Sequence, residues 1–342
     1  MRELKILGVV IFFTALVYIG VEPFAHSQMH PSVAPANYNF QQEDVEFATE
    51  QVKISEEVLA DKENDTENIE GINGAKKQLE ADKKYLTSIS SFWDDIAKID
   101  LSKGDATKGA ESFMNAGCIG CHGLKVQGMT NPMDDATASA SFGVVPPDLS
   151  TAGLIYDSNF LAALIKNPTV ALKVEHKFNE TKLHPMTQFY GLGGDIDQEI
   201  ADIVAYLKSV APKSLNDEEI FADACQRCHS MKYANISSNS DSALLTKYMG
   251  STPPDLSMMI RAKGKEYLET FINNPQKQLK GTAMPRVGLT KDAQEQVVSF
   301  MENTGDRKKA ERDSLGVKVI GFMFIFTILA YLWKVKIWRE VH

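Results

Sequence analysis

The chain of 342 residues has only four cysteines. All four belong to two short motifs, so none is left over to form a disulfide elsewhere. It also lacks an excess of positive charge, since 36 Lys and Arg oppose 45 Asp and Glu, for a net charge of −9. An acidic balance argues against a nucleic-acid partner and suits a basic protein partner.

Charge is also missing from two long apolar runs, at residues 6–21 and 315–333, apart from one early lysine in the second. Sixteen residues of helix span only about 24 Å of a hydrocarbon core of about 30 Å. Adding Leu4, Phe24 and Ala25 makes the first run long enough. A cleaved signal peptide is the alternative, but Pro23 or Tyr18 would then occupy a cleavage position that requires a small residue. We therefore expect a retained N-terminal membrane anchor.

The second apolar run is predicted to be a C-terminal membrane anchor, with a buried core helix as the alternative. Aromatic and basic residues lie at its C-terminal end, as at a cytoplasmic membrane interface. Its other flank is also basic, so charge alone does not orient this helix. The residues concerned are Tyr331, Trp333, Lys334, Lys336, Trp338 and Arg339 on one side, and Arg307, Lys308, Lys309 and Arg312 on the other.

The four cysteines lie in two Cys-x-x-Cys-His motifs. On a helical turn, residues i, i+3 and i+4 share one face, so two thiols can bond the vinyl groups of a haem while the imidazole binds its iron. The pattern predicts two covalently bound haems c and, with them, a location outside the cytoplasm. The haem-attaching residues are Cys118, Cys121, His122, Cys225, Cys228 and His229.

Three other interpretations of the cysteines remain: a zinc site, a redox site or disulfides. A four-cysteine zinc site does not need a histidine directly after each pair, and a thioredoxin-like site needs only one pair, in a βαβ setting. Haem attachment explains every residue of both motifs.

An internal repeat surrounds the motifs. Cys118 and Cys225 lie 107 residues apart, and the sequence Pro-Pro-Asp-Leu-Ser at 146–150 recurs with the same offset at 253–257. Asn-Pro at 167–168 recurs likewise at 274–275. One unit therefore occurs twice. The first unit is predicted to close with a helix at 196–210 and the second with a helix at 293–302.

Each unit is predicted to contain a haem-motif helix, a proline-rich loop, a middle helix, a loop with methionine and a closing helix. This pattern resembles the class I cytochrome c family. The resemblance implies an all-α fold, with two tandem class I cytochrome c domains between N-terminal and C-terminal transmembrane helices. The expected divisions are 1–25 for the first anchor, 26–102 for an acidic helical segment, 103–211 and 212–304 for the haem domains, and 305–342 for a linker and the second anchor.

The resemblance also implies the axial ligands. His122 and His229 are the proximal ligands, each oriented by the carbonyl of a proline in the following loop. We assign Pro147 and Pro254, with Pro146 and Pro253 as alternatives. The sixth ligand of the second haem is Met284, in a Met-Pro sequence. For the first haem it is Met186, with His184 as a competitor, because the order there is His184-Pro185-Met186.

Residues 43–70 and 75–99 are expected to form two amphipathic helices, separated by a break at Gly71 and Gly74. The histidines of both haem motifs must lie outside the cytoplasm, so both chain termini are expected inside. The predicted location is a bacterial inner membrane with the haem domains on the periplasmic side.

The layout further resembles cytochrome c1, the haem subunit of the quinol:cytochrome c oxidoreductase (cytochrome bc1) complex, in a di-haem form. This resemblance implies a cytochrome b subunit and a Rieske iron-sulfur protein as partners, and a soluble cytochrome c or an oxidase as acceptor. The chain would transfer electrons without bond chemistry of its own. Three alternatives are a di-haem subunit of a terminal oxidase, a di-haem peroxidase, and a docking protein in which haem is structural.

Overall fold

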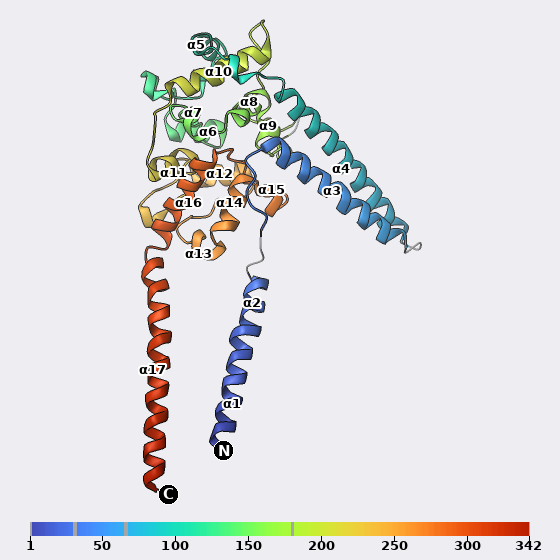
Figure 1. Ribbon diagram of the computed structural model, residues 1–342. Coiled ribbons are helices and arrows are strands. Elements are labelled where there is room, and N and C mark those ends of the chain that lie inside the picture. The colour runs from blue at the N-terminus through green and yellow to red at the C-terminus, as the bar shows by residue number, and fades with distance from the viewer. Residues whose placement is uncertain (1, 30–32, 65–67, 179–180, 342) are drawn as a thin grey trace.

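The computed structural model describes residues 2–29, 33–64, 68–178 and 181–341, which are helices joined by loops, with no β-strand among them. Two helical domains lie one above the other, with a long helical hairpin beside them and the two terminal helices below (Figure 1). The predicted all-α class is confirmed.

The first domain begins with α5 (Ala106–Asn115) and closes with α10 (Ile196–Val210), which cross each other. The crossing is close because Gly109 of α5 lies against the backbone of Asp202 in α10, where a Cβ would come within 1.9 Å of the carbonyl oxygen. Phe113 and Tyr206 pack beside this contact, with ring centroids 5.6 Å apart. Between these helices lie α6 (Asp135–Phe142), α7 (Ala152–Ile155), α8 (Ser158–Lys166) and α9 (Pro168–Ala171).

The second domain repeats this arrangement with α11 (Asp217–Cys225) crossing α16 (Lys291–Gly305). Phe221 and Phe300 pack between these two helices, with ring centroids 5.0 Å apart. The intervening helices are α12 (Ser242–Met249), α13 (Met259–Lys263), α14 (Lys265–Asn273) and α15 (Pro275–Gln278). In both domains the repeated Asn-Pro places proline at the first turn of the short helix that follows, where its missing N–H costs nothing.

The two domains are joined by backbone hydrogen bonds. The amide of Asp157 donates to the carbonyl of Gly288 at 3.0 Å, and the amide of Thr290 donates to the carbonyl of Ile155 at 2.9 Å. Gly288 has φ of +74° and lies against the ring of Phe160, which leaves no room for a side chain. These contacts fix one domain against the other.

The segment before the first domain forms a hairpin of α3 (Phe40–Glu63) and α4 (Ile69–Ile96), which extends sideways from the junction of the domains (Figure 1). The predicted break at Gly71 and Gly74 is wrong, because both glycines lie inside the first turns of α4. Asn68 caps that helix by accepting a hydrogen bond from the amide of Gly71 at 2.9 Å.

Both ends of the chain are apolar helices. The first runs through α1 (Arg2–Ala15), a π-helical turn (Leu16–Val21) and α2 (Glu22–Met29), and the last is α17 (Lys309–Val341). Spans of 24 and 31 residues within them are long and apolar enough to cross a membrane, and neither is buried by the rest of the protein. Both extend below the second domain in the same direction, so the two termini lie at the same end (Figure 1).

Candidate haem sites

Each Cys-x-x-Cys-His motif forms a single helical turn. The amide of His122 donates to the carbonyl of Cys118 at 3.0 Å, and that of His229 donates to the carbonyl of Cys225 at 2.9 Å. The first turn follows α5 after Gly117, whose φ of +72° redirects the chain, whereas the second continues directly from α11. None of the four thiols is paired in a disulfide. Cysteines and histidine therefore share one turn in each motif, as their spacing predicts.

The histidine rings are oriented by backbone carbonyls from the repeated proline loops. The Nδ1–H of His122 donates to Pro147 at 2.9 Å, and the Nδ1–H of His229 donates to Pro254 at 2.8 Å. Burial lowers the pKa of both imidazoles and thus favours their neutral form. A neutral ring with Nδ1 protonated presents the Nε2 lone pair that an iron ligand requires.

Each proline loop is held beside its motif by the aspartate and serine that follow the prolines. In the second domain, Asp255 accepts hydrogen bonds from the Ser230 hydroxyl at 2.7 Å and from the Lys232 amide at 3.0 Å, and Ser257 Oγ accepts from the Tyr233 amide at 3.0 Å.

The first domain repeats this network. Asp148 accepts from the Lys125 amide at 3.3 Å, and Ser150 Oγ accepts from the Val126 amide at 3.1 Å. These residues belong to the repeat found in the sequence, where no role was predicted for them. Their identical offset in both units was the signal that a shared contact required them.

The thiols do not form a zinc site. Burial raises the pKa of Cys225 to about 12 and also raises the pKa of Cys118 and Cys228, so the free thiols are neutral. Among the described residues, no three His, Cys, Asp or Glu side chains converge on a position that could hold a metal ion. The two cysteine pairs therefore do not combine into a four-cysteine zinc site.

The predicted sixth ligands lie in the loops before the closing helices. Met284 is half-buried and packs against the core of the second domain. Met186 is also half-buried. The Nδ1–H of its neighbour His184 donates to the carbonyl of Met186 at 3.0 Å. The ring of His184 packs edge-on against that of Phe178, with ring centroids 4.9 Å apart. Met186 and His184 both stay candidates for the first haem.

These residues fit covalent haem. Each domain offers two unpaired thiols and a neutral, oriented imidazole on one turn, together with a methionine-bearing loop. An all-helical domain with this attachment turn is a c-type cytochrome domain, and the chain contains two of them.

Comparison with known families agrees with this class. The model of the Cytochrome c family matches the chain twice, at residues 106–211 and 218–305, and the chain therefore belongs to that family. Covalently bound haem c is implied, and two domains are consistent with two haems. No curated protein and no solved structure matches the chain.

Proposed function

We propose that the chain is the di-haem cytochrome c1-type subunit of a quinol:cytochrome c oxidoreductase, which passes electrons from a Rieske iron-sulfur protein to a soluble cytochrome c or an oxidase. The observation that carries this proposal is the placement of two joined cytochrome c domains above two apolar terminal helices that leave the same side. Such a chain suits a complex in which quinol is oxidised within the membrane and electrons leave at its surface.

The two Cys-x-x-Cys-His motifs would supply the haem attachment and the iron ligands. Cys118, Cys121, Cys225 and Cys228 would hold the haems, and His122 and His229 would bind iron through Nε2. Haem bound in this way supplies a one-electron iron couple, whose potential a methionine ligand raises. The hydrogen bonds between the domains, including those of Asp157 and Thr290, keep the two sites at a fixed separation. A fixed separation matters because electron transfer slows steeply with distance.

The proposed location is a bacterial inner membrane, with the haem domains on the periplasmic side and both termini in the cytoplasm. Attachment of haem c outside the cytoplasm supports this orientation. The common direction of the terminal helices supports it further, since two anchors leaving one face can enter one membrane together.

Isolation of the complex from native membranes tests the proposal. After mild solubilisation and purification through a tag on this chain, we expect a b-type cytochrome and a Rieske protein to co-purify, and a quinol to reduce the bound haem c. Co-isolation with a copper-haem oxidase would instead assign the chain to a terminal oxidase. Isolation alone, with peroxide turnover, would assign it to the peroxidases.

A further inference from the structure

A buried carboxylate joins the N-terminal hairpin to both haem domains. Asp44 of α3 is fully buried, and its two oxygens accept hydrogen bonds from the guanidinium of Arg286 at 2.6 and 2.9 Å. The ammonium of Lys173 donates to it at 2.6 Å and the indole Nε1–H of Trp93 at 2.9 Å. Arg286 belongs to the second domain, Lys173 to the first and Trp93 to α4, so one side chain ties three parts of the protein together.

The next residue makes a second such contact. Glu43 is also buried, and it accepts hydrogen bonds from the ammonium of Lys277 at 2.9 Å and from the amide of Asn274 at 3.1 Å. Lys277 lies in α15, just before the loop 279–290 that contains Met284, and Arg286 lies within that loop, two residues beyond Met284. The hairpin therefore contacts the chain on both sides of Met284.

The loop between Lys277 and Arg286 has no regular secondary structure, and its conformation depends on specific contacts. Gly281, with φ of +81°, donates its amide to Oε1 of Gln276 at 2.8 Å. The carbonyl of Thr282 accepts from Gln276 at 3.0 Å and from Nε2 of His176 at 3.2 Å. The amide of Arg286 donates to the carbonyl of Leu172 at 3.0 Å, which fixes the chain two residues beyond Met284.

Removal of the buried charge of Asp44 should displace the side chain of Arg286. Burial alone would raise the pKa of Asp44, but the charges of Arg286 and Lys173 outweigh it and hold the pKa below its usual value. Without that negative charge, the guanidinium of Arg286, itself fully buried, would lose the carboxylate that it is paired with. An uncompensated buried charge is strongly unfavourable, so Arg286 would move toward water and pull the adjoining loop with it.

We propose that Asp44 is a positioning residue for Met284: through Arg286, the N-terminal hairpin sets the position of the sixth ligand of the second haem and thereby its potential. The inference rests on the proposed assignment of Met284 as that ligand. It gives residues 40–96, which the cytochrome c family match does not cover, a role in the haem chemistry of the chain.

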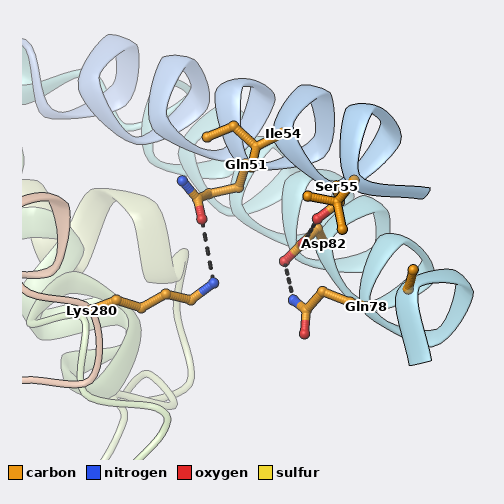
Figure 2. Close-up of a pocket in the computed structure, with 8 residues that line it drawn as sticks. Gln51, Ile54, Ser55, Gln78, Asp82 and Lys280 are labelled. Carbon is orange, nitrogen blue, oxygen red and sulfur yellow. Dashed lines mark hydrogen bonds between the residues drawn. The ribbon is translucent and has the colours of Figure 1, made fainter. Parts of the chain in front are cut away.

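The test is Asp44→Asn in the full-length, haem-loaded protein, with a matched control in the same hairpin. Asp82 of α4 is also hydrogen-bonded, to Ser55 at 2.5 Å and Gln78 at 2.9 Å, but these partners lie within the hairpin (Figure 2). We expect Asp44→Asn to weaken the methionine-to-iron charge-transfer band of one haem and lower its midpoint potential, leaving the other haem unchanged. Asp82→Asn should alter neither haem.

Unchanged spectra and potentials in Asp44→Asn would overturn the proposal, provided that Met284→Ala removes one charge-transfer band. If Met284→Ala removes none, the ligand assignment itself is wrong and the inference falls with it. Should Asp44→Asn fail to accumulate, Arg286→Lys keeps the charge but loses the two-pronged contact, and it should lower the same midpoint potential by a smaller amount. A normal potential in Arg286→Lys would then count against the proposal.

Discussion

The imidazole of His229 donates its Nδ1–H to the carbonyl of Pro254 at 2.8 Å, and His122 repeats this contact with Pro147 at 2.9 Å. Two residues 25 positions apart are thus brought together in the same way in both domains. The contact orients the ring, and the aspartate that follows each proline pair holds the carbonyl in place.

Asp255 is therefore expected to stabilise the second domain. Although burial works in the opposite direction, hydrogen bonds from Ser257 and Ser230 lower the pKa of Asp255 to about 2. Because the folded value lies below the usual 3.8, this stabilisation is present above about pH 4 and is lost as the pH falls toward 2. Asp255→Ala should cost about 1–3 kcal/mol at pH 7, seen as a lower thermal midpoint of the haem signal. The exposed Asp292→Asn should cost little, and an equal loss in both variants would contradict the prediction.

The closeness of α5 and α10 gives a second prediction. In Gly109→Ala the new methyl group would collide with the backbone of Asp202, so the first domain should lose about 3 kcal/mol or more. Gly74→Ala is the matched control, because nothing lies within 4 Å of a Cβ there and alanine favours a helix by up to about 1 kcal/mol. Thermal melts of both variants measure the difference. Equal melting temperatures would show that the crossing tolerates a side chain.

The haem content of the chain is directly measurable. Haemochrome spectroscopy on the purified protein should give two haems c per chain, and a variant with Cys225→Ala and Cys228→Ala should give one. A ratio of one in the unmodified protein would disprove the interpretation of the repeat as two haem domains.

The sixth ligand of the first haem can be assigned by substitution. We expect Met186→Ala to abolish the methionine charge-transfer signature of that haem and His184→Ala to preserve it. The reason is that a thioether ligand produces this band and an imidazole does not. The reverse result would make His184 the ligand and place the potential of the first haem much lower.

Glu175 makes stability depend on pH. Burial raises the pKa of Glu175 from its usual 4.5 to about 7. The folded protein therefore holds this proton more tightly than the unfolded chain, and stability falls as the pH rises from 4.5 to 7. At pH 8, Glu175→Gln should increase the free energy of unfolding by at most about 3 kcal/mol and so raise the thermal midpoint. At pH 4.5 the same substitution should change the midpoint little. The exposed Glu218→Gln should show no such difference, and a gain from Glu175→Gln that is equal at both pH values would rule out this cause.

Features that depend on residues close together in the chain could be predicted from the sequence. The spacing of the Cys-x-x-Cys-His motif fixes one helical turn, and the offset of 107 residues fixes two equivalent domains, because helical geometry relates residues three and four apart. The closing helix at 196–210 was predicted at its observed bounds for the same reason. The predicted break at the glycines of α4 was wrong, since an asparagine cap and tertiary packing outweighed the low helix propensity of glycine.

The choice of proline carbonyl for each histidine and the contacts of the hairpin depend on the folded chain and could not be predicted from the sequence. Asp44 and Arg286 are separated by 242 positions, and no local pattern relates them. Their pairing follows from burial, which makes an unpaired charge so unfavourable that the fold must bring the two together.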